Sequence, residues 1–504
     1  MATLSSDPRL DSLARFRELQ AQLAALWPAM TMRTVGDQVR TLVVVNSINV
    51  RVPDHMAPVM PAYEERFLFL VLALLGGPGT RVIYLTSQPI LPRLIDYYLS
   101  LMRSTPPADL RQRLDLVSVG DGSPRPLIDK VLSRPRLIER LRAIIGDTDR
   151  ALILPFMTSP GEVELAVRLG VPVYGADPRL AHFGTKSGAR RLFAEAGIPH
   201  PEGREGVRHV DDLVDAISEL QASNSALESV MVKLDDSAGG LGNAVVRLNG
   251  ANGRRDLRRR VDAIEIEDAS GVREEFFAEL EDRGGIVEER ISGGEVRSPS
   301  AQLRASPDRQ VEILSTHDQV LGGATGQTFL GCRFPADQEY GALVARLGER
   351  IGWILAREGV IGRFGVDFVV VRRPDGWFPY AIEINLRNGG TTHPMLTMQA
   401  LTDGHFEANE CRFRTTQGER FYVATDHLES PAYAALTPDD VLDGVRDERL
   451  SWDPDRLLGV ALHLVSAVAV AGRLGLTAVG SDPFDAQRRF EAAQKVVNDL
   501  ADPH

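Results

Sequence analysis

Two apolar, β-branched runs of the sequence, 366–371 and 378–385, constrain the fold more than any other feature. They flank Pro374-Asp375-Gly376, which is typical of a tight turn because proline presets one backbone angle and glycine accepts angles closed to other residues. Such runs on both sides of a turn predict a β-hairpin. We therefore expect two antiparallel strands joined by a turn centred near Asp375.

Three oxygen-bearing side chains converge in this hairpin. With the expected centre, Asp367 lies opposite Glu383, and Asn385 projects to the same side as Glu383 because side chains alternate along a strand. Two facing carboxylates repel each other, but a divalent cation removes the repulsion, and ligands that are all oxygen favour Mg²⁺ or Mn²⁺ over zinc. The alternative is a hairpin without metal, in which Arg363 and Arg387 form the salt bridges.

The composition is that of a globular protein with several domains. The chain has 504 residues, 43% of them hydrophobic and 25% charged, which predicts about three or four domains. A net charge of −12 disfavours nucleic acid or an anionic membrane as a partner. Cys332 and Cys411 are too few and too far apart for a disulfide framework or a zinc site. The start lacks a secretory pattern, and no apolar run reaches the ~20 residues of a spanning helix. We therefore expect a cytoplasmic enzyme.

The first 183 residues predict a helical lead-in, 1–40, and an open α/β domain, 41–183. Apolar strand runs alternate there with helical patterns, as in a sheet covered by helices. The predicted strands are 41–47, 81–87, 114–119, 151–155 and 171–175, and the predicted helices are 62–75, 91–103, 134–145 and 160–169. No Gly-x-Gly-x-x-Gly and no Gly-x-x-x-x-Gly-Lys follows these strands. We interpret this domain as a scaffold that forms one wall of a cleft.

A glycine-rich loop at 235–243 follows Lys233, near the end of a predicted strand. Glycines let the backbone approach a phosphate chain and offer N–H donors, and lysine adds a positive charge. Lys186, at the start of the preceding helix, is a second cation. The alternative is an ordinary hairpin turn. Five arginines within 254–260 are interpreted as a solvated helix face.

The segment 285–295 carries acidic residues on both sides of a Gly-Gly pair. A strand that links two lobes can present its backbone N–H and C=O groups to the edge of a base. Glu295, just past the glycines, can accept hydrogen bonds from ribose hydroxyls. An exposed acidic strand end is an equally good interpretation.

Taken in this order, these segments resemble the ATP-grasp ligases. The resemblance implies nucleotide binding by Lys186, Lys233, Ser237, Gly239, Gly240, Gly242, Glu288, Glu289, Ile291 and Glu295. It implies ATP as the nucleotide and a magnesium triad of Asp367, Glu383 and Asn385. Where D-alanine–D-alanine ligases have an arginine two residues before the metal aspartate, this chain has Gly365. The candidates for the missing phosphate contact are therefore Arg363 and Arg387, and Arg304 is a third candidate catalytic arginine.

A closer resemblance is to the pheganomycin-type peptide ligases, through segments such as Arg81-Val-Ile-Tyr-Leu-Thr-Ser-Gln-Pro and Ser315-Thr-His-Asp-Gln-Val-Leu-Gly-Gly. It implies a pre-ATP-grasp domain at 41–183, ATP-grasp lobes at 184–290 and 291–415, and a C-terminal domain at 416–504. In that family an amino acid, a guanidino-bearing one, is joined to the amine of an amino acid or peptide. This implies specialised peptide (antibiotic) biosynthesis with small-molecule partners. A homodimer is the candidate assembly, and the sequence leaves the oligomeric state open.

The expected substrate walls are the 297–304 strand, the 315–333 segment and the 387–394 loop. Their candidate contacts are Arg297, Ser298, Ser300, His317, Asp318, Thr391, Thr392 and His393. A structural role for His317 is the better interpretation, and helix capping by the threonines is as good as substrate binding. Two other functions stay open: an ATP-grasp kinase that phosphorylates a small molecule, and a nucleotide-binding regulatory protein without turnover.

Overall fold

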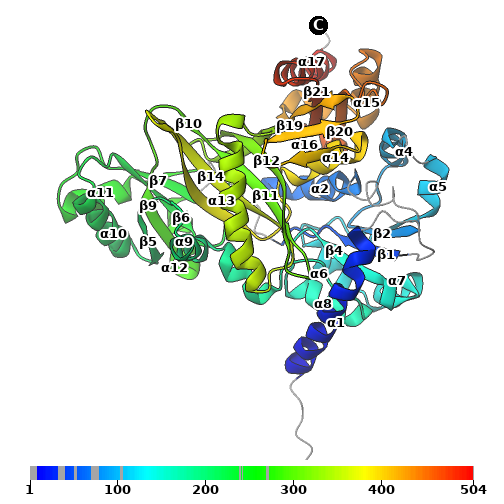
Figure 1. The fold of residues 1–504 in the computed structure, drawn as a ribbon, viewed down its shortest axis with the longest axis horizontal. Coiled ribbons are helices and arrows are strands. Elements are labelled where there is room, and N and C mark those ends of the chain that lie inside the picture. The colour runs from blue at the N-terminus through cyan, green and yellow to red at the C-terminus, as the bar shows by residue number, and fades with distance from the viewer. Residues whose placement is uncertain are drawn as a thin grey trace, which may run out of the picture.

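The computed structural model describes residues 8–31, 40–49, 54–69, 79–102, 106–237, 240, 242–267 and 272–502. Its described strands form sheets of four, five, nine and three strands. Figure 1 shows the five-stranded sheet and its helices on the left, the large sheet in the centre and the N-terminal α/β part at the lower right. Among the described helices, none combines the length and the apolar composition needed to cross a bilayer.

The first sheet is parallel, in the order β3-β2-β1-β4. It comprises β1 (Arg40–Val45), β2 (Thr80–Thr86), β3 (Leu114–Ser118) and β4 (Ala151–Pro155). These four strands confirm the predicted ones. The expected strand at 171–175 is wrong, because only an isolated bridge joins Val173 to Ile153. Pro172 interrupts the run, since it has no N–H to donate to a ladder.

Helices cover both faces of this parallel sheet, as its buried, apolar strands require. They are α1 (Pro8–Thr31), α2 (Met60–Arg66), α4 (Pro92–Leu101), α5 (Pro107–Gln112), α6 (Leu127–Leu132), α7 (Pro135–Ile145) and α8 (Pro160–Leu169), with 3₁₀ turns at Asp54–Val59, Thr148–Arg150 and Pro178–Gly184. The predicted helix at 62–75 begins as α2, which ends at Arg66; Leu68 and Phe69 are helical again after a turn at Phe67, and 70–75 lies outside the described residues.

The second sheet is a five-stranded lobe in the order β5-β9-β6-β7-β8. Its strands are β5 (Gly203–Val207), β6 (Ser229–Leu234), β7 (Asn243–Arg247), β8 (Glu265–Ile266) and β9 (Gly285–Glu289), and its helices are α9 (Lys186–Glu195), α10 (Val210–Ser223), α11 (Arg254–Asp262) and α12 (Arg273–Arg283). The arginine-rich run forms α11. Arg254 and Arg258 form exposed ion pairs with Asp211 and Asp215, which confirms the solvated face.

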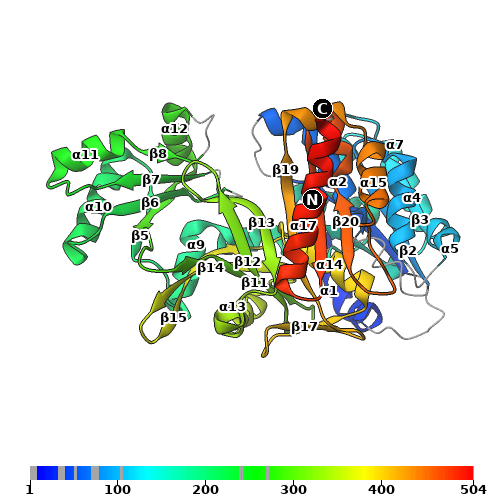
Figure 2. The same ribbon diagram turned by 90° about the horizontal axis from the view of Figure 1, so that it is seen from above.

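The large sheet runs in the order β10-β14-β11-β12-β13-β19-β21-β20, with β15 paired to β14. Its strands are β10 (Val296–Arg297), β11 (Pro299–Ala305), β12 (Val311–Gly322), β13 (Thr328–Phe334), β14 (Gly362–Arg373), β15 (Gly376–Asn385), β19 (Phe421–Glu429), β20 (Gly459–His463) and β21 (Arg473–Gly480). Strands from after residue 416 therefore continue the sheet of the preceding lobe, and Figure 2 shows β19 beside β13. The domain boundaries stay a proposal.

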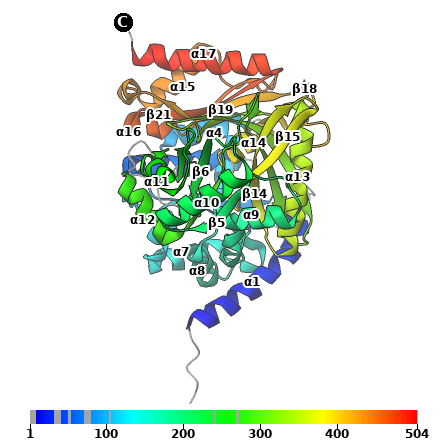
Figure 3. The same ribbon diagram turned by 90° about the vertical axis from the view of Figure 1, so that its left-hand side faces the viewer.

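Helices pack against this sheet, with α13 (Gln338–Arg357) on β11 and β12 and α17 (Pro483–Ala501) on β19 and β21. The same part of the chain also forms α14 (Thr392–Thr402), α15 (Pro438–Asp447) and α16 (Val468–Ala471), with 3₁₀ turns at Pro431–Ala435 and Val465–Ala467. A small sheet is built from β16 (His405–Glu407), β17 (Arg412–Thr415) and β18 (Gly418–Glu419). Figure 3 shows α17 and α1 at opposite ends of the molecule.

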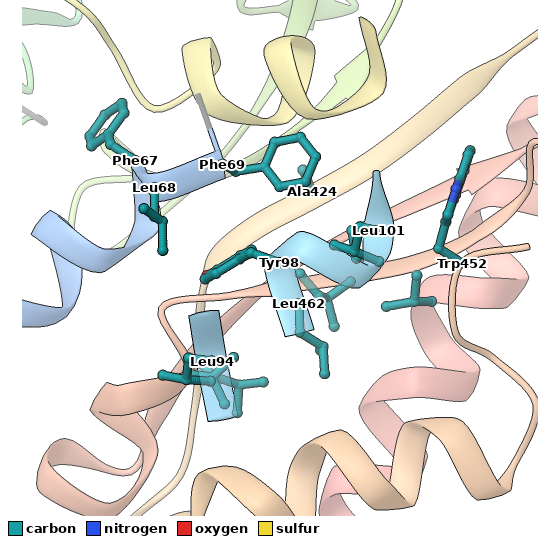
Figure 4. Packing of buried hydrophobic residues seen from close by; sticks show 14 of the residues in the cluster. Phe67, Leu68, Phe69, Leu94, Tyr98, Leu101, Ala424, Trp452 and Leu462 are labelled. Carbon is teal, nitrogen blue, oxygen red and sulfur yellow. The ribbon is translucent and has the colours of Figure 1, made fainter. Parts of the chain in front are cut away.

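One hydrophobic core is shared by the N-terminal α/β part and the C-terminal strands. Figure 4 shows Tyr98 and Leu101 of α4 gathered with Leu462 of β20 and Trp452. The same cluster reaches Phe67, which follows α2. Because such a core excludes water from both parts at once, the first and last segments of the chain are packed as one unit.

Candidate active site

The β14–β15 hairpin reaches the predicted pairing by a different route. Its turn is the two residues 374–375, which alone would place Asp367 opposite Ile382. A β-bulge shifts the register by one residue, so that Asp367 pairs with Glu383. A shift of one residue exchanges the two faces of a strand, and the bulge therefore brings both carboxylates and Asn385 to one face. The predicted pairing is confirmed.

The three oxygen-bearing side chains are held by cations and by one another. Asn385 Nδ2 donates to Asp367 Oδ2 at 3.1 Å, and Arg387 Nη2 donates to Asn385 Oδ1 at 3.0 Å. Lys186 Nζ, from the start of α9, lies 2.9 Å from Glu383 Oε1. Two predicted features of the chain, the first lysine and the hairpin, thus meet in one cluster.

The two carboxyl groups differ in their proton affinity. Burial raises the pKa of Asp367 to about 7, and the negative charge of Glu383 adds to this effect. Burial would also raise the pKa of Glu383, but the positive charges of Lys186, Lys233 and Arg387 together lower it. Two carboxylates and an amide oxygen on one strand face suit Mg²⁺ or Mn²⁺, and the raised pKa of Asp367 marks a place short of positive charge.

A cavity of about 1510 Å³ lies between the five-stranded lobe and the large sheet. Its walls include Met231, Lys233, Glu288, Glu289, Arg290, Ile291, Arg297, Ser298, Gln319, Leu321, Val369 and Ile382. Apolar side chains from both sheets face each other here, beside the backbone of the strand that links the lobes. A flat aromatic ring with polar edges fits such walls.

Glu288, at the wall of this cavity, is held by two buried cations. It is 2% exposed and accepts hydrogen bonds from Lys233 Nζ at 2.5 Å and from Arg190 Nη1 at 3.0 Å. Its carboxylate therefore positions Lys233, while the backbone of 289–291 is left to line the cavity. The sequence pattern did not single out Arg190, because an arginine within a helix carries no local sign of a buried partner.

The glycine-rich loop packs against the start of α9 and the β12–β13 turn. Lys186 Nζ donates to the carbonyl oxygen of Ser237 at 3.3 Å. Gly240 has a φ of +88°, and a Cβ there would lie 2.6 Å from the carbonyl oxygen of Gln327. A side chain at this position is excluded, both by the backbone angle and by this contact. Gly242 lies beside Ser237, and Gly239 lies outside the described residues.

A second cavity, of about 330 Å³, surrounds the carboxylate pair and shares walls with the large one. Residues that line both include Lys233, Ser298, Gln319 and Ile382. The expected residues that line the smaller cavity are Ser298, Ser300, Gly240, Lys233, Asp367, Glu383, Asn385, Arg387 and Thr391. The two cavities therefore adjoin each other along these side chains.

Two of the candidate arginines lie elsewhere. Arg304 and Arg363 are register partners on β11 and β14, four residues beyond Ser300 and Asp367 on their strands, which amounts to about 13 Å. Neither is among the described residues that line the two cavities. Arg304 Nε donates to Glu312 at 2.6 Å. Among the three candidates, the structure brings Arg387 to the carboxylates.

Glu295 and Arg297 also depart from expectation in part. The two side chains are exposed and form an ion pair with each other. Arg297 lines the large cavity, whereas Glu295 is absent from its described walls. A ribose contact from Glu295 would need this ion pair to open. The ribose contact of Glu295 stays a prediction, made from its place after the two glycines and from the resemblance.

His317 and Asp318 serve packing in this structure. His317 is fully buried, and its Nε2 lies 2.6 Å from the hydroxyl of Tyr422. Asp318 accepts hydrogen bonds from the hydroxyl of Tyr340 at 2.7 Å and from the N–H of Asp337 at 3.0 Å, which ties β12 to the start of α13. Neither lines a described wall of the two cavities, which supports the structural interpretation of His317.

Thr392 and His393 are likewise engaged with the protein. Thr392 Oγ1 accepts a hydrogen bond from the N–H of Gly389 at 2.8 Å, close to the start of α14. The ring of His393 lies 4.0 Å from that of His463, with its Nε2 at 3.9 Å from Asp426. Of the predicted hydroxyl residues after the triad, Thr391 alone lines the cavity of the carboxylates among the described residues.

We expect His317 to make the protein less stable in acid. Burial lowers its pKa to about 3, against about 6.5 in an unfolded chain. Below pH 6.5 the unfolded state therefore binds the proton first, and the free energy of unfolding falls by about 1.4 kcal/mol per pH unit. The free energy of unfolding is measured with denaturant at pH 7 and at pH 5. From pH 7 to pH 5 it should fall by about 2 kcal/mol more in the wild type than in His317→Gln. Equal falls in the two proteins would contradict a lowered pKa for His317.

Several lining residues were not predicted. Gln319 Nε2 donates to Asp367 Oδ1 at 3.0 Å and lines both cavities. It follows His317 by two residues, so strand alternation could have placed it on the same face. Ile48, Met60 and Phe156 come from the N-terminal α/β part and also line the smaller cavity. No local pattern marks them, because their place depends on how distant segments pack.

Known proteins with similar sequences and folds agree with this geometry. A profile of the family "IQCH-like, ATP-grasp" matches residues 178–262. The L-propargylglycine–L-glutamate ligase of Streptantibioticus cattleyicolor is 33% identical over 455 residues, which cover 88% of this chain and 92% of that protein.

Two solved structures share the fold at low identity. Biotin carboxylase of Campylobacter jejuni, in complex with a β,γ-ATP compound, has a TM-score of 0.54 and 13% identity, covering 92% of this chain and 96% of that one. An ADP complex of N5-carboxyaminoimidazole ribonucleotide synthetase has a TM-score of 0.51 and 13% identity, covering 94% and 100%. The chain belongs to the ATP-grasp family and is an ATP-dependent ligase that joins a carboxylate to an amine.

Proposed function

We propose that this ligase activates the carboxylate of an amino acid as an acyl phosphate and joins it to the amine of an amino acid or peptide. The observation that carries the proposal is that the two cavities adjoin and share Lys233, Ser298 and Gln319 as lining residues. A nucleotide in the large cavity and a carboxylate substrate in the small one would meet at the Asp367–Glu383 pair. ADP and phosphate are the expected by-products.

The roles of the residues follow from their places. Lys186 and Lys233 would neutralise the phosphate chain. Lys233 lines both cavities, and Lys186, which is not among their described lining residues, lies 2.9 Å from Glu383 of the smaller cavity. When bound at Asp367, Glu383 and Asn385, Mg²⁺ or Mn²⁺ supplies neutralisation of the charge on the transferring phosphoryl group. Arg387, anchored on the Asn385 amide, is the proposed contact to that group. Ser300 and Thr391 are proposed to hold the organic carboxylate.

Water must be kept from an acyl phosphate until the amine arrives. The carboxylate pair is partly buried, and the cavity around it is bounded by the glycine-rich loop at Gly240 and by Phe329, Phe156 and Met60. These walls come from three different parts of the chain. A protein nucleophile is not needed for this chemistry, because the amine substrate attacks the acyl phosphate directly.

The test is turnover with defined substrates. The protein is incubated with ATP, Mg²⁺ and pairs of L-amino acids, beginning with L-glutamate and L-propargylglycine, the pair named for the relative. ADP and the condensed product are measured by mass spectrometry. ADP formed together with an amide supports the proposal. A stable phosphorylated amino acid, with no amide from a broad set of amines, would instead favour a kinase.

We expect Lys233→Met to weaken nucleotide binding at least about tenfold, because the charge that faces the phosphates is lost while Arg190 still pairs with Glu288. Lys186→Met should act in the same direction. Titration with a non-hydrolysable ATP analogue measures the effect. Lys495→Met, an exposed lysine on α17, is the matched control. Unchanged affinity in both test variants would remove the nucleotide from this region.

A further inference from the structure

A third cavity, of about 410 Å³, lies at the carboxyl ends of the parallel strands β1 and β2. It is lined by Asn46, Ile48, Asn49, Ala57, Met60, Pro61, Glu64, Ser87, Pro124, Arg125, Pro126, Leu127 and Lys130. Asn46 and Ser87 directly follow the two strands. Open parallel sheets bind ligands at this edge, and the volume is within the range of small-molecule sites.

This cavity adjoins the one that holds the carboxylate pair. Ile48 and Met60 line both of them. The three cavities therefore form a series, from the nucleotide walls through Asp367 and Glu383 to the edge of the first sheet. A substrate that reacts at the centre can place its far end in the third cavity.

The cation in this cavity is buried and has hydrogen-bonding capacity to spare. Lys130 is 2% exposed, and its Nζ donates to Ser87 Oγ at 2.8 Å. An ammonium group has three N–H donors. Within the described parts of the chain, no carboxylate lies within ion-pair distance of this Nζ. A buried ammonium without a direct anionic partner is costly unless a ligand supplies the charge.

Neighbouring groups hold the ammonium group of Lys130 in place. Ser87 donates its hydroxyl to Glu64 Oε1 at 2.7 Å and its N–H to Glu64 Oε2 at 2.5 Å, so its hydroxyl oxygen accepts from Lys130. Burial lowers the pKa of Lys130, and the charge of Glu64 opposes that shift. Arg125, half exposed and paired with Asp121 at 3.1 Å, adds a second cation at the wall. Ile48, Met60 and Leu127 supply apolar walls.

We propose that this cavity binds the free, non-reacting carboxylate of an amino-acid substrate, with Lys130 as its charge partner and Arg125 as a second contact. The inference rests on the proposed ligase function. An acceptor amino acid or peptide reacts through its amine and keeps a carboxylate. A donor that reacts through a side-chain carboxylate keeps its α-carboxylate. The ligand chemistry is the same in the two cases, and the experiment separates them.

The test compares each substrate with its primary amide, in which the free carboxylate is removed. Once the assay above has identified a productive pair, KM and kcat are measured for the acid and the amide of each partner. For the wild type we expect one of the two substrates to show a KM at least tenfold higher as its amide than as its acid. Lys130→Met should raise KM for the acid of that partner to the level of its amide and leave KM for ATP unchanged. The partner affected identifies donor or acceptor.

Lys130→Arg, which keeps the charge, should recover part of the discrimination, and Lys495→Met should leave it intact. If Lys130→Met does not fold, Arg125→Gln is the second test variant, because that side chain is half exposed. It should reduce the ratio of the KM for the amide to the KM for the acid. Calorimetric titration with the same acid and amide gives a readout that does not depend on turnover. Full acid–amide discrimination for both substrates in the folded variants would overturn the proposal. Absence of amide formation by the wild type would instead count against the ligase function.

Discussion

Replacing Glu383 by glutamine, or Asp367 by asparagine, will lower the rate of ADP formation by at least roughly two orders of magnitude. Each change removes one of the two charges that face each other across β14 and β15. A neutral amide binds a divalent cation more weakly and leaves the transferring phosphoryl group less neutralised. The hydrogen bond from Asn385 and the ion pair to Lys186 hold the two side chains in place, so the loss should appear in kcat.

The measurement is steady-state ADP release at saturating Mg²⁺, with circular dichroism to confirm folding. Asp375→Asn is the matched control, because it removes a carboxylate from the exposed turn of the same hairpin. We expect that variant to keep full activity. Near-wild-type turnover by Glu383→Gln and Asp367→Asn would show that the carboxylate pair is structural.

Asp426→Asn will destabilise the protein by about 3–5 kcal/mol, the usual effect of leaving one charge of a buried ion pair without its partner. Asp426, in β19, forms an ion pair with Arg66, which ends α2, and both side chains are at most 5% exposed. His463 Nε2 lies 2.8 Å from the same carboxylate. Burial would raise the pKa of Asp426, but Arg66 and the two histidines lower it well below its usual range.

Urea unfolding of the wild type and the variant provides the measurement. The double variant Arg66→Met/Asp426→Leu should lose less than the sum of the single losses, because it removes both charges at once. Asp499→Asn, in the exposed pair with Lys495, is the control and should change stability by less than about 1 kcal/mol. A loss below about 1 kcal/mol for Asp426→Asn would mean that Arg66 finds another partner.

Local patterns accounted for much of the secondary structure. The four apolar runs of the first domain became β1 to β4, and the run of 171–175 failed because Pro172 cannot donate. The Asp367–Glu383 pair was predicted from the hairpin alone, by assuming a turn centred near Asp375. Even there, the turn alone would have given the wrong face, and the bulge at Ile382 corrected it.

The sequence by itself determined where the strands and the hairpin form and which side chains alternate along a strand, since these patterns act over a few residues. The bulge that sets the final register of the hairpin was not among them. Tertiary structure decided which end of a strand faces the cavities, and so selected Arg387 over Arg304 and Arg363. It also joined the last strands to the central sheet and brought Met60 and Lys130 to the substrate side. Those contacts join segments far apart in the chain, and no local pattern records them because they arise from packing.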